Sequence, residues 1–253
     1  MRRLTTITLC FTCTAGAFGV FLRWLQLITA FEPDTGLPIR GARLSIAVSA
    51  LSLSVAVFLV LVTVLASKKT YTGKTAVNLP VDSLFFSLVS KFVCVLAIIG
   101  AVMLFISADG NSGPGAGRTL AVLAFATGIS YPAFISRFRR SSGLFTCILA
   151  LIPVIFCSYW LIVSYKDHAA NPVIWEFAFE ILAISASLLS LFFVAGYPCG
   201  SPKPFLSFCF CNLSAFLCIV TLADVRPLSL SLTFASLALI ELMYAGGTLI
   251  RYK

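Results

Sequence analysis

Long apolar runs alternate with short polar connections along the whole chain. The last run, Leu228 to Ile250, has 23 residues and a single ionisable side chain, Glu241. As an α-helix with a rise of ~1.5 Å per residue it is roughly 34 Å long, which is enough to cross the ~30 Å hydrocarbon core of a bilayer. Seven earlier runs have the same character. The pattern therefore predicts an all-α integral membrane protein, a bundle of eight transmembrane helices.

These helices form one polytopic membrane domain over residues 1–253, because their connections are far shorter than a soluble domain. The first run continues past Ala15-Gly16-Ala17, a sequence that a signal peptidase could cut. A retained helix is therefore a better interpretation than a cleaved signal peptide. The expected spans are approximately 4–28, 44–66, 84–107, 119–135, 144–165, 173–196, 205–222 and 228–250.

Composition supports the membrane interpretation. Of the residues, 60% are hydrophobic and 11% are charged, whereas soluble domains have about 25% charged residues. A lipid bilayer is therefore the first partner that we expect. The net charge of +9 would suggest nucleic acid in a soluble protein. Here most Lys and Arg residues stand in short connections beside apolar runs, where they set the topology of the helices, so we expect no nucleic-acid partner.

The nine cysteines give no evidence of a metal site. Only Cys199 lies outside an apolar run. Cys10 and Cys13 form a CxxC pair, but no second pair and no histidine cluster could complete a site. We therefore expect no metal and no cofactor.

The uneven distribution of Lys and Arg predicts the orientation. With eight spans, both termini and the second, fourth and sixth connections lie on one side of the membrane. That side has eleven bases and the other five, so the positive-inside rule places both termini in the cytoplasm. We expect the plasma membrane or the bacterial inner membrane. The eleven are Arg2, Arg3, Lys68, Lys69, Lys74, Arg137, Arg139, Arg140, Lys203, Arg251 and Lys253, and the five are Arg40, Arg43, Arg118, Lys166 and Arg226.

Residues 1–140 and 141–253 each contain four of the expected spans. The second and sixth spans share a similar sequence, AVSALSLS from Ala47 and AISASLLS from Ala183. This similarity is compatible with two parallel four-helix halves, an arrangement found in some transporters. Chance similarity between apolar sequences is the alternative explanation.

Four ionisable side chains fall within or at the edge of the spans: Arg23, Lys91, Glu180 and Glu241. A charge at the membrane centre costs ~2.5–3.5 kcal/mol, so each needs a partner or water. Lys91 and Glu241 lie at similar depths from the cytoplasmic end, and Arg23 and Glu180 at similar depths from the outer end. We therefore predict two ion pairs between helices, Lys91 with Glu241 and Arg23 with Glu180. Such pairs could fix the register of the helices, or Glu241 and Glu180 could titrate or bind an ion.

Small polar residues recur at helical spacing on several spans. They include Ser187 and Ser190 on the sixth span, Ser207 and Ser214 on the seventh, and Ser87 on the third. Such faces let helices pack closely in lipid and form hydrogen bonds between helices. They could also line the path of a solute.

Transport of a small solute or ion between these polar faces is the best prediction for function. It predicts a hydrated cavity that touches Glu180, Glu241 or Lys91. The alternative is a non-catalytic accessory, sensor or assembly subunit of a larger membrane complex, with membrane-protein partner subunits. Enzymatic activity is less expected, because the one histidine, His168, has no Ser or Cys partner in any catalytic pattern. The small-molecule or ion ligand is not identified by the sequence.

Overall fold

The computed structural model describes residues 2–31, 39, 42–70, 84–107, 115–140, 143–169 and 174–248, and its secondary structure consists of α-helices. Eight helices among these residues are long and apolar enough to cross a membrane. The predicted all-α class and the eight apolar helices are therefore confirmed, while residue 173 and residues 249–250 of the expected spans lie outside the described residues. The helices are α1 (Arg2–Thr29), α2 (Arg43–Thr70), α3 (Leu84–Ser107), α4 (Ala116–Arg140), α5 (Leu144–His168), α6 (Ile174–Ala195), α7 (Pro204–Thr221) and α8 (Leu228–Thr248).

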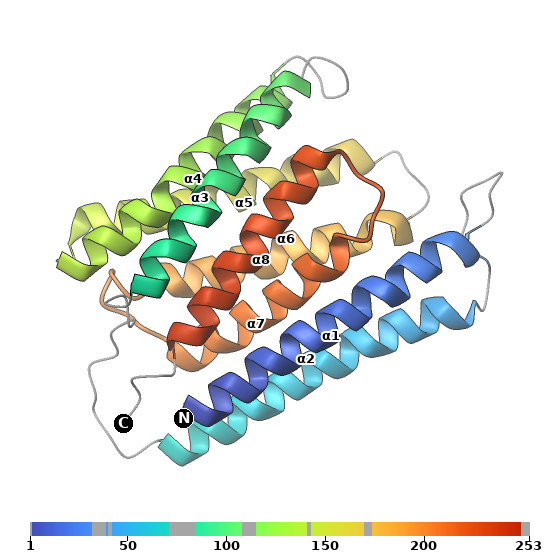
Figure 1. Ribbon diagram of the computed structural model, residues 1–253, viewed down its shortest axis with the longest axis horizontal. Coiled ribbons are helices and arrows are strands. Elements are labelled where there is room, and N and C mark those ends of the chain that lie inside the picture. The colour runs from blue at the N-terminus through green and yellow to red at the C-terminus, as the bar shows by residue number, and fades with distance from the viewer. Residues whose placement is uncertain are drawn as a thin grey trace.

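Helices α3 to α8 form a ring in which each packs against the next, and α3 closes the ring by packing against α8 (Figure 1). Helices α1 and α2 form a hairpin outside the ring, against α7. Successive helices run in opposite directions, so α1, α3, α5 and α7 all begin at one end of the molecule. We call this end the basic end, because the exposed bases Arg3, Lys68, Arg137 and Lys203 lie there.

The contacts between helices do not follow the two predicted halves. Helices α3 and α4 pack against α8 and α5, which belong to the other half of the chain. A repeated four-helix unit would also repeat its internal contacts. Within the described residues, however, α6 packs extensively against α7, whereas α2 makes no comparable contact with α3. The halves are therefore not confirmed.

The distribution of apolar side chains fits a membrane environment. Helix α7 contacts α1, α2, α6 and α8, and most of its side chains are buried. Helices α2 and α3 instead point large apolar side chains away from the protein, including Leu53, Leu88 and Ile106. Water would make such a surface unfavourable, whereas lipid accommodates it.

Glycines allow close contacts between helices, as two positions illustrate. A Cβ atom on Gly19 would lie 2.6 Å from Cγ2 of Val220, so α1 approaches α7 where only glycine fits. A Cβ atom on Gly128 would lie 3.2 Å from Cβ of Ala97, at the contact of α4 with α3. Close approach at small residues is the usual basis of helix packing in lipid.

Candidate functional site

Four charged side chains form a connected network at the end opposite the basic end, which we call the ion-pair end. Asp224, in the connection between α7 and α8, accepts hydrogen bonds from Nε of Arg23 (2.8 Å) and Nη2 of Arg226 (2.5 Å). Nη1 of Arg226 lies 3.2 Å from Oε2 of Glu180. None of the four side chains is more than 8% exposed. Two positive and two negative charges therefore balance one another out of contact with solvent.

Uncharged polar groups extend this network to two further helices. The Ser164 hydroxyl on α5 donates to Oε1 of Glu180 (2.7 Å). Nη1 of Arg23 donates to Oε1 of Gln26 (3.0 Å), and Nε2 of Gln26 donates to the Ser45 hydroxyl on α2 (3.1 Å). The network thus connects α1, α2, α5, α6 and the α7–α8 connection, and it holds the ion-pair end together.

Aromatic rings cover both guanidinium groups. Arg23 lies 4.8 Å from the centre of the Phe179 ring, and Arg226 lies 5.0 Å from that of Phe234. Such contacts stabilise a desolvated cation. These buried and mutually paired charges therefore suit a role in stabilising this end of the bundle.

Glu241 has a different environment. Its side chain is completely buried on α8, where Ser190 of α6 donates a short hydrogen bond to Oε1. Its Oε2 atom is buried and has no hydrogen-bond partner. Within the described part of the chain, no Lys, Arg or His forms an ion pair with this carboxyl. A carboxylate here would carry a buried charge without compensation, which is strongly unfavourable.

A polar cluster surrounds Glu241 where α6 and α7 meet. The hydroxyls of Ser187 and Ser214 are 2.8 Å apart, and Ser187 lies 3.4 Å from Sγ of Cys218. Ser214 and Cys211 both interact with the Glu241 carboxyl. The predicted polar faces of the sixth and seventh spans therefore face each other, with the acid between them.

The other two predicted serines lie farther from this contact. Ser207 is completely buried on α7, with its hydroxyl 3.9 Å from Sγ of Cys211. Ser87 is half-buried on α3, and its carbonyl accepts a hydrogen bond from Ser90. The predicted faces thus differ in role, and only those of α6 and α7 meet at an ionisable group.

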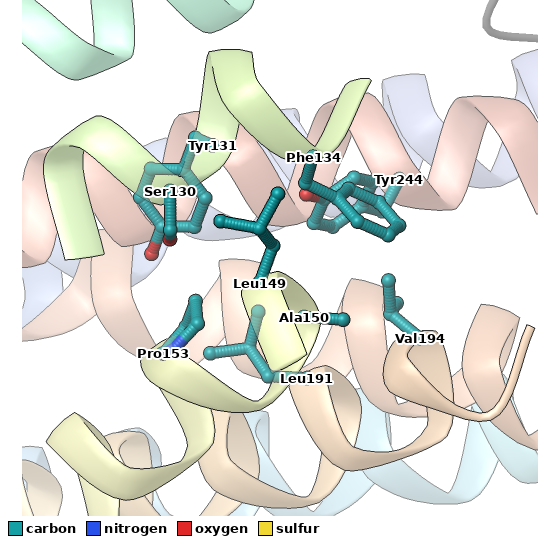
Figure 2. A pocket seen from close by; sticks show the side chains of 9 residues that line it. All are labelled: Ser130, Tyr131, Phe134, Leu149, Ala150, Pro153, Leu191, Val194 and Tyr244. Carbon is teal, nitrogen blue, oxygen red and sulfur yellow. The ribbon is translucent and has the colours of Figure 1, made fainter. Parts of the chain in front are cut away.

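A cavity of about 10 Å³ lies between α4, α5, α6 and α8, toward the basic end from Glu241 (Figure 2). Its size suits one water molecule. Pro153 of α5 lines it and has no N–H, so the carbonyl of Leu149 lacks its helical partner. Its remaining lining comprises Ser130, Tyr131, Phe134, Ala150, Leu191, Val194 and Tyr244.

The predicted hydrated cavity at an ionisable group is not observed among the described residues. A second cavity, of about 170 Å³, lies at the basic end beside α6. Neither cavity is lined by Glu241, Glu180, Lys91 or Arg23. Glu241 is completely buried, and neither of these cavities reaches it in this conformation.

The predicted ion pair between Lys91 and Glu241 is wrong. Lys91 is exposed on α3, and it forms no ion pair with any described residue. Helix α3 does pack against α8, but at Gly100, whose added Cβ atom would lie 3.2 Å from the Ser229 carbonyl oxygen. Lys91 precedes Gly100 by nine residues. Because each residue of an α-helix turns the chain by about 100° around the helix axis, Lys91 and Gly100 lie on opposite sides of α3. Similar depth in the membrane was therefore not sufficient for contact.

The second predicted pair, Arg23 with Glu180, has the correct residues but the wrong partners. Arg23 pairs with Asp224, and Glu180 pairs with Arg226. The two predicted residues belong to one network because Asp224 and Arg226 stand between them. The sequence analysis counts Arg226 among the bases of the outer side and does not select Asp224. Both residues belong to the α7–α8 connection. Its six residues between Thr221 and Leu228 are too few to leave the end of the bundle, which is the signal that could have identified them.

Asn212 is another polar residue that the sequence analysis did not select. It lies buried within α7, and the Thr12 hydroxyl of α1 donates to its Oδ1 atom at 3.0 Å. Its position in the middle of an apolar run is the signal that could have identified it, because a side-chain amide needs a hydrogen-bond partner in lipid. Its contact explains part of the attachment of the α1–α2 hairpin to the ring.

Among the described residues, no group of three His, Cys, Asp or Glu side chains could hold a metal ion. The eight apolar helices are consistent with a multi-pass membrane protein. No protein-family model matches the chain, and no curated protein and no solved structure is detectably similar to it.

Proposed function

We propose that this protein transports a small solute or an ion across a membrane, and that Glu241 binds and releases a proton during transport. The supporting observation is the buried Glu241 carboxyl, which has one oxygen without a partner and no counter-ion among the described residues. Ionisable groups inside a membrane are expensive, and they usually serve ion pathways or proton relays.

A structural role explains Glu241 poorly. Glutamine has nearly the same shape and hydrogen-bonding ability, and it never carries a charge. An acid at this position therefore adds the risk of an uncompensated charge without improving packing. A group that gains and loses a proton requires the acid, because the amide cannot titrate.

The surroundings of Glu241 provide a route for conformational change. Loss of the proton would place a charge between α6, α7 and α8 and would favour a conformation in which water reaches the carboxyl. The polar faces of Ser187, Ser190 and Ser214 would line that water. The ion-pair network holds the opposite end together in the present conformation, so opening toward the basic end requires fewer broken contacts.

The orientation and location belong to the same proposal. We place both termini in the cytoplasm and the protein in the plasma membrane or the bacterial inner membrane, on the basis of eleven bases against five. Several of these bases, including Lys74, Arg251 and Lys253, lie outside the described residues.

Proton flux measurements test the proposal. Full-length protein is reconstituted into liposomes that contain a pH-sensitive dye, and a membrane potential is imposed. We expect the wild type to accelerate proton entry and Glu241→Gln to reduce it to the rate of protein-free liposomes. Asp167→Asn is the matched control, because Asp167 is an exposed acid on α5 and should leave the flux unchanged. Equal flux through the wild type and Glu241→Gln would refute the role of Glu241.

Thermal stability provides a second readout. Glu241→Gln should leave the melting temperature unchanged or raise it, because the carboxyl has no ion-pair partner to lose. A large loss of stability would instead show that the acid is a structural element of the α6–α7–α8 contact.

One observation favours the alternative, an accessory or assembly subunit of a membrane complex. Lys91 is exposed in the apolar outer face of α3, where an acid on the helix of a partner subunit could pair with it. A photo-crosslinking amino acid at the neighbouring Phe92 tests this role in the native membrane. A protein adduct that disappears in the Lys91→Leu variant would support it, whereas adducts with lipid alone would oppose it.

A further inference from the structure

The cavity of about 170 Å³ at the basic end lies outside the site described above. Apolar side chains line its part within the helices, among them Leu151 of α5 and Phe192 and Phe193 of α6. Cys199, Ser201 and Lys203 line the part in the α6–α7 turn. A cavity of about 150 Å³ can hold a benzene-sized molecule, so this one can hold several methylene groups of a longer chain.

The cavity faces the lipid phase. Phe192 is 55% exposed and Leu151 is 38% exposed, so both stand at the outer surface of the bundle between α5 and α6. A molecule that enters from the side would meet apolar groups within the membrane and polar groups at its boundary. This order matches a phospholipid, with acyl chains in the hydrocarbon region and a phosphate at the interface.

The turn holds Lys203 at a defined place. Gly200 has a φ of +80°, a conformation that residues with a side chain rarely adopt. A Cβ atom on Gly196 would lie 2.9 Å from the Ser201 carbonyl oxygen, and the Ser201 N–H donates to the Gly196 carbonyl at 3.0 Å. Both glycines are therefore needed for this tight turn, which leads directly to Lys203.

The polar part of the cavity is suited to a negative charge. Lys203 is exposed and forms no ion pair with any described residue. It precedes α7, and its side chain does not cap that helix. The N-terminus of a helix carries a partial positive charge, which adds to the attraction for phosphate.

The basic end as a whole is also suited to negatively charged groups. Its sequence segments contain eleven Lys and Arg residues but a single acid, Asp82. Basic residues beside transmembrane helices attract anionic lipids of the cytoplasmic leaflet. In the orientation that we expect, the basic end meets this leaflet.

We propose that the cavity between α5 and α6 binds one anionic phospholipid, with its phosphate at Lys203 and an acyl chain against Leu151 and Phe192. This site is independent of Glu241 and of the proposed transport. A soluble phosphate compound would leave the apolar part empty, and a partner helix would not enter a cavity of this size.

Native mass spectrometry of the full-length protein tests the proposal with phosphatidylglycerol and phosphatidylcholine that have identical acyl chains. We expect the wild type to retain one phosphatidylglycerol about fivefold more readily than phosphatidylcholine, the contribution of one basic residue near an anionic surface. Lys203→Gln should remove this preference, and Lys203→Arg should keep it. Lys68→Gln is the matched control, because Lys68 is exposed at the same end on α2, away from the cavity.

Ser201→Trp tests the apolar part, because a bulky side chain should obstruct the cavity and weaken retention of both lipids. Melting curves of each variant show whether it is folded, and Lys203→Arg remains informative if Lys203→Gln does not fold. Equal retention of both lipids by the wild type would overturn the proposal. A preference that survives Lys203→Gln, or that falls equally in Lys68→Gln, would also overturn it. Displacement of the lipid by inorganic phosphate alone would show a phosphate site instead.

Discussion

Asp224 is the residue whose substitution tests the ion-pair network most directly. Among the described residues it is the acid that contacts both arginines, at 2.8 Å from Arg23 and 2.5 Å from Arg226. Asp224→Asn keeps the shape of the side chain and removes its charge. Arg23 then loses its charged hydrogen bond to Asp224, while Arg226 keeps its ion pair with Glu180.

The size of the effect follows from burial. The side chain of Arg23 is fully buried and that of Asp224 is 6% exposed, so solvent screens their interaction little. Removal of one partner from a buried ion pair costs about 3–5 kcal/mol, because the other charge remains buried without compensation. For a chain of this size the expected fall in melting temperature is on the order of 10 °C.

The assay is thermal unfolding of the purified protein in detergent, with Asp167→Asn as the control. Asp167 is an exposed acid at the same end of the bundle, so its neutralisation should change stability by less than about 0.5 kcal/mol. The double variant Arg23→Gln/Asp224→Asn should lose less than the sum of its single variants, because both charges of the contact are removed. If Asp224→Asn unfolds at the temperature of Asp167→Asn, the network does not hold the ion-pair end together.

Three further predictions concern other parts of the molecule. Ser190→Ala removes the hydrogen bond to Glu241 and should lower stability by about 1–3 kcal/mol in the same unfolding assay; an unchanged melting temperature would contradict the contact. Lys91→Leu should leave stability unchanged, and its effect should add to that of Glu241→Gln within about 0.5 kcal/mol, since the two residues do not pair. A hydrogen bond with Cys147 and partial burial raise the pKa of Cys199 to about 11. Alkylation of this exposed thiol should therefore be slow at neutral pH and accelerate as the pH rises toward 11. In the Cys147→Ala variant, alkylation at neutral pH should be faster than in the wild type. Identical rates in the two proteins would show that Cys147 has no influence on the Cys199 thiol.

The eight helices could be predicted because the thickness of the bilayer sets the length of apolar sequence that each helix needs. A helix that crosses the hydrocarbon core needs about 20 mostly apolar residues, and this requirement is visible in the sequence without knowledge of neighbours. The ring of α3 to α8 could not be predicted in the same way. Its order depends on where small residues such as Gly100 and Gly128 permit close approach, and the sequence does not say which helix fills the space beside each of them.

The partners of the charged residues were predicted from depth alone, and depth was not sufficient. Position along a helix gives the height of a side chain in the membrane, but contact also depends on its direction around the helix axis. Lys91 and Glu241 satisfied the first condition and failed the second, because Lys91 points away from α8. Arg23 and Glu180 lie in the same network but pair with other residues. Asp224 and Arg226, from the short α7–α8 connection, stand between them.

The contrast between the two clusters is the reason to associate Glu241 with function. Each of the four charged side chains in the ion-pair network has a partner of opposite sign, so the network is stable in the conformation that the structure shows. Glu241 is buried equally well, yet one of its oxygens has no partner and no base of the described residues pairs with it. A protein that needed only a packed bundle would lose nothing by replacing this acid with an uncharged residue. In the function that we propose, the carboxyl is neutral in the enclosed conformation and becomes charged when the bundle opens, which would couple a proton to a conformational change.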